Sequence, residues 1–174
     1  MALETAGFGS GFSRNTQPYL RCAQDKIEEA CGVFGIYAPG EDLSRVSTYA
    51  LLALQHRGQE SAGIAISDGG SIHLKKGNGL VSEVFSHNPE LEGIPAVSAI
   101  GHVRYSTAGG GFTENAQPLL ISYRHGQLAV AHNGNLVNAD ELRGRLEKEG
   151  SIFQTTTDSE LVMHLVARCG YRDL

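Results

Sequence analysis

From residue 31 onward, short apolar runs alternate with turn-forming segments, which is typical of a domain built on β-strands. The run Cys31–Tyr37 ends at Pro39-Gly40 and predicts a buried strand. Residues 62–67 and 71–74 flank Asp68-Gly69-Gly70 and predict a β-hairpin. Further strands are expected at residues 96–103, 119–123 and 127–131, the last two on either side of the turn His125-Gly126.

Three segments carry helical signals. Ser44 is expected to cap the first helix, whose apolar side chains are Val46, Tyr49, Leu52 and Leu54. The other two helices are expected to begin with capping boxes, whose residue pairs are Asn138 with Glu141 and Thr157 with Glu160. Gly150 is expected to end the second helix. Strands that predominate early, at a spacing that suits antiparallel sheets with helices outside, predict a layered α+β fold.

Residues 1–30 differ from the rest of the chain, because they mix small and polar residues without periodicity. They lack the apolar run of about 7–15 residues that a secretory signal needs. Their acidic residues argue against a mitochondrial-type transit peptide; these are Glu4, Asp25, Glu28 and Glu29. Two interpretations stay open, a frayed amino terminus and a removable leader.

Charge and composition narrow the class of protein. The chain has 14 Lys and Arg against 19 Asp and Glu, and its net charge of −5 lacks the basic surplus of nucleic-acid-binding domains. No stretch approaches the roughly 20 apolar residues that cross a bilayer. We therefore expect a cytoplasmic protein without nucleic-acid or membrane partners. Cys22, Cys31 and Cys169 form no C-x-x-C pair, so we expect no zinc or iron–sulfur site made from this chain alone.

Taken singly, the candidate functional residues are weak signals. A lone cysteine such as Cys31 is more often a small buried hydrophobe than a nucleophile. The glycine-rich segment 107–111 could cradle an anion, and Gly77-Asn-Gly79 lacks the third glycine and the βαβ context of a dinucleotide site. His102 and His132 have no third ligand at helical spacing, so we interpret both as structural histidines rather than a metal pair.

The order of five motifs along the chain is a stronger signal than any one of these residues. The motifs are Cys31-Gly-Val-Phe-Gly35, Leu54-Gln-His-Arg-Gly-Gln-Glu-Ser-Ala-Gly63, Gly101-His-Val-Arg-Tyr-Ser-Thr107, Ala131-His-Asn-Gly-Asn-Leu136 and Thr157-Asp-Ser-Glu160. Their order resembles the glutaminase domain of the amidophosphoribosyltransferases, which are type 2 glutamine amidotransferases with an N-terminal nucleophile. Aminosugar synthases are the alternative, but they typically read Tyr-Arg-Gly-Tyr-Asp-Ser where this chain has His-Arg-Gly-Gln-Glu-Ser at residues 56–61. They also usually have Trp and His where this chain has Tyr105 and Ala108.

The resemblance implies an N-terminal nucleophile hydrolase-like αββα sandwich of antiparallel sheets. Its catalytic positions match Cys31 as the nucleophile and Asn133 with Gly134 as the oxyanion hole. Its substrate-binding positions match Arg104, which would bind the α-carboxylate, Asp158, which would bind the α-ammonium, and Thr107, which would contact the substrate. Its supporting positions match Arg57 and Gly58, which would pack around the nucleophile. Without the family, Asp158 reads as a first-turn helix acid and Arg104 as a surface ion pair.

The resemblance also gives residues 1–30 a role. A thiol without a neighbouring base is mostly protonated at neutral pH. The α-amino group of an N-terminal cysteine can accept the thiol proton, but it exists only when everything before Cys31 has been removed. We therefore interpret residues 1–30 as a leader that keeps the enzyme inactive.

We interpret residues 31–174 as a truncated glutamine amidotransferase domain, whose sandwich is incomplete in this fragment. The resemblance implies that it hydrolyses glutamine to glutamate and ammonia. The complete enzyme then converts phosphoribosyl pyrophosphate to 5-phosphoribosylamine, the first committed step of purine biosynthesis. The resemblance places the phosphoribosyltransferase domain and its Mg²⁺ outside this chain, and it leaves open whether that missing part also holds a 4Fe–4S cluster. No cofactor is expected in residues 1–174. We expect a homo-oligomer at full length; the alternative in another class is an inactive, unprocessed glutamine-binding fragment.

Overall fold

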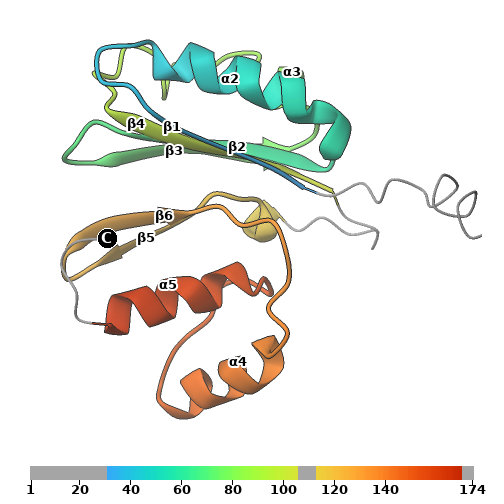
Figure 1. Ribbon diagram of the computed structural model, residues 1–174, viewed down its shortest axis with the longest axis vertical. Helices are drawn as coiled ribbons and strands as arrows, with labels where there is room; N and C mark the ends of the chain where they lie inside the picture. The colour runs from blue at the N-terminus through green and yellow to red at the C-terminus, as the bar shows by residue number, and fades with distance from the viewer. Residues whose placement is uncertain (1–30, 106–112, 170–174) are drawn as a thin grey trace, which may run out of the picture.

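The computed structural model describes residues 31–105 and 113–169, which form two antiparallel sheets between helices (Figure 1). The four-stranded sheet has the order β1-β4-β2-β3, with β1 Gly32–Tyr37, β2 Ser61–Ser67, β3 Ile72–Asn78 and β4 Ser98–Arg104. The second sheet pairs β5 Leu119–Tyr123 with β6 Gly126–Val130. The helices are α2 Leu43–Leu54, α3 Val81–Val84, α4 Ala139–Lys148 and α5 Ser159–Arg168, with short 3₁₀ turns η1 Gln55–Arg57 and η2 Thr113–Asn115.

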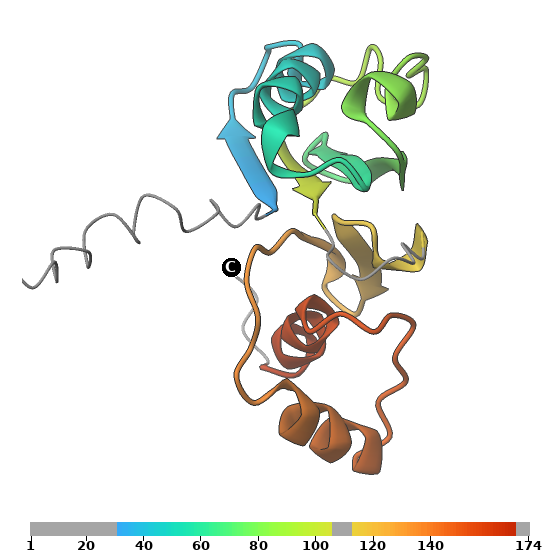
Figure 2. The same cartoon turned by 90° about the vertical axis from the view of Figure 1, so that its right-hand side faces the viewer.

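The layers run helix, sheet, sheet, helix, and Figure 2 shows the β5–β6 hairpin lying between the first sheet and α5. This arrangement confirms the predicted α+β sandwich of antiparallel sheets. Both predicted hairpins are also confirmed, because β2 pairs with β3 and β5 pairs with β6 around the expected turns. No helix in the described part of the chain is long and apolar enough to span a membrane.

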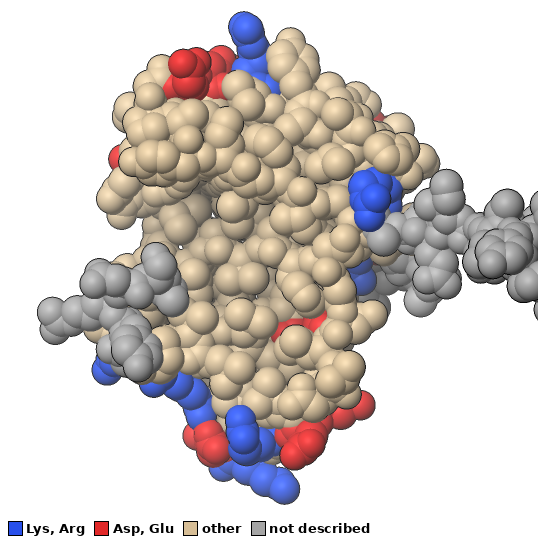
Figure 3. All heavy atoms as spheres, viewed as in Figure 1, with Lys and Arg blue, Asp and Glu red and all other residues tan. Residues whose placement is uncertain are grey.

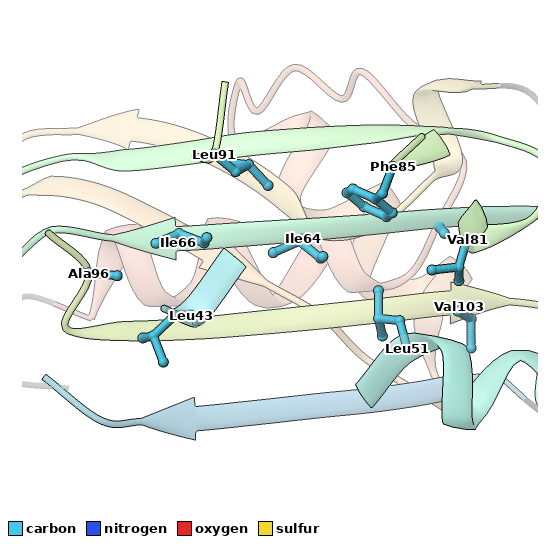
Figure 4. Packing of buried hydrophobic residues seen from close by; sticks show 11 residues of the cluster. Leu43, Leu51, Ile64, Ile66, Val81, Phe85, Leu91, Ala96 and Val103 are labelled. Carbon is cyan, nitrogen blue, oxygen red and sulfur yellow. The ribbon is translucent and has the colours of Figure 1, made fainter. Parts of the chain in front are cut away.

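The main hydrophobic core fills the space between the first sheet and α2 with α3 (Figure 4). Alternate residues of β2 and β4 face this layer, since successive side chains of a strand point to opposite faces. Their fully buried members meet Leu51 of α2 and Val81 of α3; they are Ala62, Ile64, Ile66, Ala99 and Val103. The opposite residues of the same strands, including His102 and Arg104, therefore face the second sheet.

The start of α2 differs from the expectation. Asp42, not Ser44, occupies the N-cap, and its Oδ1 accepts a hydrogen bond from the Arg45 amide at 3.1 Å. Ser44 lies inside the first turn and is buried, where its hydroxyl accepts from the Asn88 amide at 3.0 Å. The apolar residues Val46, Tyr49 and Leu52 that indicated a helix lie on its exposed side.

The two predicted capping boxes are also wrong, although both helices exist. Asn138 and Asp158 are the N-cap residues of α4 and α5, and neither side chain makes a capping hydrogen bond. The Glu160 carboxylate instead accepts from the amides of Gln154 and Thr155, both at 2.8 Å. Gly150 ends α4 as expected, with φ +90° and the backbone bonds of a Schellman motif.

A second, smaller core joins the inner sides of α4 and α5 through Leu142, Leu146 and Leu161. The outer side of α4 is highly charged, and Figure 3 shows charged side chains gathered at the end of the molecule that α4 forms. Acidic residues occupy the first turn of α4 and basic residues the last, which is the order that the helix dipole favours.

Candidate active site

Cys31 directly precedes β1 and lies beside the end of β4. The antiparallel register pairs Gly32 with Val103, so Cys31 comes beside the last residues of β4. The half-buried thiol contacts the main chain of Tyr105 twice. The Tyr105 amide donates to Cys31 Sγ at 3.4 Å, and Sγ lies 3.7 Å from the Tyr105 carbonyl oxygen. The sulfur is thus held at a fixed place by backbone groups.

The carbonyl oxygen of Cys31 is bound by two of the predicted site residues. Arg57 Nε donates to it at 3.3 Å, and Asn133 Nδ2 donates to it at 2.7 Å. Arg57 lies in η1 and Asn133 in the loop after β6, so segments far apart in sequence meet at the cysteine.

Gly58 packs directly on the main chain at the end of β4. A Cβ atom at this position would lie 2.5 Å from the carbonyl carbon of Arg104 and 2.7 Å from its carbonyl oxygen. No side chain fits there without moving the backbone. Gly58 therefore lets η1 approach β4 closely enough for Arg57 to reach Cys31.

A pocket of about 400 Å³ opens beside the thiol and brings together three of the predicted residues, Cys31, Arg104 and Asp158. Its other lining residues are Tyr105, Gln117, Asn135, Leu136, Ala139, Asp140, Arg143, Thr156, Thr157 and Leu161. Asn133 and Gly134 are not among the lining residues. Asn135 and Leu136, which follow them in the chain, do line the pocket. A nucleophile, a cation and an anion thus share one cavity.

Arg104 lines this pocket, and the ion pair that it forms within the described residues is long. Its closest anionic contact is Glu60, with Nε 3.7 Å from Oε2, which is too long for a good hydrogen bond. Its Nη1 is buried without a hydrogen-bond partner among the described residues. The side chain as a whole is 22% exposed and lines the pocket, and a planar guanidinium can bind a ligand carboxylate through two parallel hydrogen bonds.

Asp158 occupies the N-cap of α5, but its side chain makes no capping hydrogen bond and binds other groups. One carboxylate oxygen, Oδ2, accepts from the Leu136 amide at 2.6 Å, and the other lies 3.8 Å from His132 Nδ1. The side chain is 15% exposed. Asp158 thus lies at the start of α5, as the helix-end interpretation expected, but its carboxylate also joins the helix to the 133–136 loop and faces the pocket.

The remaining predicted residues are placed less fully. Gly134 has φ +148°, in the region that favours glycine, and a Cβ there would lie 3.2 Å from His132 Nε2. Thr107 lies outside the described residues. Tyr105 and Gln117 were not anticipated from the sequence; Tyr105 acts through its main chain, which gives no side-chain signal.

The structural interpretation of His102 agrees with the structure, which leaves it 1% exposed. Burial lowers the pKa of His102 to about 4. Across residues 31–105 and 113–169, no three or more His, Cys, Asp or Glu side chains gather in a way that could hold a metal ion.

Comparison with known proteins gives a consistent picture. Residues 102–174 match the model of a glutamine amidotransferase domain. The chain is 53% identical over 146 residues to an amidophosphoribosyltransferase of Bacillus subtilis and 54% identical over 139 residues to that of Synechococcus elongatus. These matches cover 83% and 79% of this chain, but only 30% and 28% of the relatives.

Solved structures agree with the sequence matches. One described as the allosteric regulatory enzyme of purine biosynthesis is 51% identical, with a TM-score of 0.74 over 80% of this chain and 30% of that one. The likeness confirms the N-terminal nucleophile hydrolase-like fold class. The chain spans about 30% of the length of the relatives it matches.

Proposed function

We propose that this chain, which belongs to the amidophosphoribosyltransferase family, hydrolyses glutamine to glutamate and ammonia at Cys31. The observation that carries the proposal is the shared pocket of Cys31, Arg104 and Asp158. An amino acid has a carboxylate and an ammonium at one end, and glutamine has a reactive amide at the other. The pocket offers a complementary group to each of the three.

The binding roles follow from charge and geometry. Arg104 lines the pocket with only a 3.7 Å contact to Glu60, and a planar guanidinium can bind a carboxylate through two parallel hydrogen bonds. Asp158 supplies the anion for the α-ammonium group. Its second oxygen is held by the Leu136 amide, which fixes the direction of the carboxylate. Together they would orient the side-chain amide of glutamine toward Cys31.

The chemical step is an acyl transfer. Cys31 Sγ attacks the amide carbon, its proton passes to the leaving nitrogen, and the C–N bond breaks to release ammonia and leave a thioester. Water then adds to the thioester, and the C–S bond breaks to release glutamate and restore the thiol. Each tetrahedral intermediate carries an oxyanion that needs hydrogen-bond donors.

Asn133 and the amide of Gly134 are the proposed donors to this oxyanion. One N–H of the Asn133 side chain is directed at the Cys31 carbonyl, which ties the amide group to the nucleophile. An amide NH₂ has two N–H donors, so the second is available to the substrate. Losing one such donor typically costs about 2.7–4 kcal/mol of transition-state stabilisation.

The proton acceptor is the α-amino group of Cys31, which exists once residues 1–30 are removed. Arg57 and Asn133 both hold the Cys31 carbonyl, and this would keep the neighbouring amine close to its own Sγ. Mass spectrometry of the active protein tests this step: its first residue should be Cys31. Activity with residues 1–30 still attached would contradict it.

In the complete protein, the released ammonia would convert phosphoribosyl pyrophosphate to 5-phosphoribosylamine, as the names of the relatives suggest. Any Mg²⁺ or iron–sulfur cluster would lie in the part of the complete protein beyond this chain. Thr107 remains a predicted substrate contact.

Steady-state kinetics with glutamine in the full-length gene product tests the two binding roles. Arg104→Lys keeps the positive charge but loses the planar guanidinium that can bind a carboxylate through two hydrogen bonds. Asp158→Asn keeps the shape of the side chain but loses its negative charge. Each should raise KM for glutamine by about tenfold or more, the value of one charged hydrogen bond. Matched controls are Arg145→Lys in the last turn of α4 and Asp42→Asn at the N-cap of α2. A normal KM in a folded Arg104 or Asp158 variant would refute that residue's role.

A further inference from the structure

A buried segment, which we call the 115–118 strap, crosses the inner face of the first sheet just before β5. Asn115 and Gln117 are 6% and 7% exposed, and Ala116 and Pro118 are buried more completely. Gly63 of β2 makes room for the strap, because a Cβ there would lie 2.2 Å from the carbonyl oxygen of Gln117. Lys76 Nζ donates to the Ala116 carbonyl at 2.5 Å. The strap is therefore fixed to the first sheet.

From the strap, the Gln117 side chain reaches both segments that carry the proposed site. Its Oε1 accepts from the His132 amide at 2.7 Å, and its Nε2 donates to Ser159 Oγ at 3.1 Å. His132 directly precedes Asn133 in sequence, and Ser159 directly follows Asp158. Ser159 is buried, and its Oγ lies 3.5 Å from His132 Nδ1. The side-chain amide of Gln117 thus links the loop that carries Asn133 to the start of α5.

We propose that Gln117 is a positioning residue for glutamine hydrolysis, an inference that rests on the proposed function. Its bond to the His132 amide sets the position of the loop that carries Asn133. Its bond to Ser159 sets the position of Asp158 relative to that loop. Because the strap is fixed to the sheet that also ends in Arg104, Gln117 aligns the groups of the substrate site with one another.

The two arms of Gln117 predict separable effects. Gln117→Met has nearly the same shape but makes neither hydrogen bond. A displacement of about 1 Å in a catalytic group costs on the order of 100-fold in rate, so kcat for glutamine should fall by about 10- to 100-fold, with KM also raised. Alkylation of the Cys31 thiol by iodoacetamide forms no oxyanion and needs neither Arg104 nor Asp158, and Arg57 still holds the Cys31 carbonyl. The rate of alkylation should therefore fall by much less than kcat for glutamine.

Two further variants separate positioning from stability. Asn88→Leu removes an equally buried amide, 6% exposed, that donates to Ser44 Oγ at 3.0 Å on the α2 side of the sheet. It should lower the melting temperature while leaving glutamine kinetics unchanged. Ser159→Ala removes the Asp158 arm and the 3.5 Å contact of Ser159 Oγ with His132 Nδ1, but it keeps the bond from the His132 amide to Gln117. It should therefore raise KM severalfold and lower kcat much less than Gln117→Met does. Ser159→Ala also carries the test if Gln117→Met does not fold.

The experiment measures glutamate release and thiol alkylation in the full-length gene product, with glutamine and iodoacetamide as the probes. A wild-type protein that releases no glutamate would refute the proposed function itself. An active wild type with an unchanged kcat in folded Gln117→Met would overturn the positioning role alone. The role is also overturned if Asn88→Leu loses as much kcat as Gln117→Met, or if Ser159→Ala leaves KM unchanged.

Discussion

Acidification should weaken β4 through one buried histidine. His102 belongs to β4, which lies between β1 and β2 in the first sheet, and its side chain is buried. Burial lowers the pKa of His102 to about 4 from the ordinary 6.5; a hydrogen bond with the His132 main chain opposes this shift, and the nearby charges of Arg104 and His132 add to it. The folded strand therefore holds this ring neutral in a range of pH where an opened strand would protonate it.

The sign and size of the effect follow from linkage. Between pH 6.5 and 4 the open state binds more protons than the folded state, so the free energy of opening falls as the pH falls. The loss should reach about 2 kcal/mol between pH 7 and pH 5, and on the order of 3 kcal/mol by pH 4. Above pH 6.5 the free energy of opening keeps the full contribution of the neutral His102 ring.

Hydrogen exchange of the β4 amides, corrected for intrinsic rates, measures this opening free energy directly. In His102→Leu, a change of similar volume without a titrating group, the pH-dependent part should disappear. His87→Leu, an exposed histidine, serves as the control and should keep the wild-type slope. If the opening free energy of His102→Leu showed the same slope between pH 7 and pH 5 as that of wild type, protonation of His102 would not be the cause of the acid weakening of β4.

Two more perturbations test local features. Gly58→Ala should destabilise the fold by about 1–3 kcal/mol through its clash with the Arg104 main chain, and should reduce glutamine hydrolysis as well. Gly35→Ala, where a Cβ meets nothing within 4 Å, should do neither in parallel melting and activity assays. The hydrogen bond from His73 lowers the pKa of Asp68 to about 2, so its contribution to the β2–β3 turn is present above pH 3.8 and is lost as the pH falls toward 2. Hydrogen exchange at the turn should lose this acid dependence in Asp68→Asn.

The sequence predicted the strands well because their signals are local. Alternation or short apolar runs mark β2 to β6, and glycine-containing turns mark both hairpins. Helix caps were predicted poorly because tertiary partners compete for capping side chains. Glu160 binds the amides of Gln154 and Thr155 instead of its own helix, and Ser44 binds Asn88.

The site was predictable only through its resemblance to a family. Nothing local says that Cys31, Arg104 and Asp158 share a pocket, because their proximity depends on sheet register and on the packing of α5. Gln117 was missed for a related reason. A glutamine before proline is an ordinary turn residue in sequence, and its two bonds to distant segments exist only in the fold.

The most direct test of the central claim is Cys31→Ser in the full-length gene product, assayed with glutamine and with ammonia as nitrogen donors. The serine keeps the shape of the site but replaces the sulfur nucleophile. Glutamine-dependent turnover should fall to background while ammonia-dependent formation of 5-phosphoribosylamine stays largely intact, because ready-made ammonia bypasses this site. Substantial glutamine-dependent turnover in the variant would show that Cys31 is not the nucleophile.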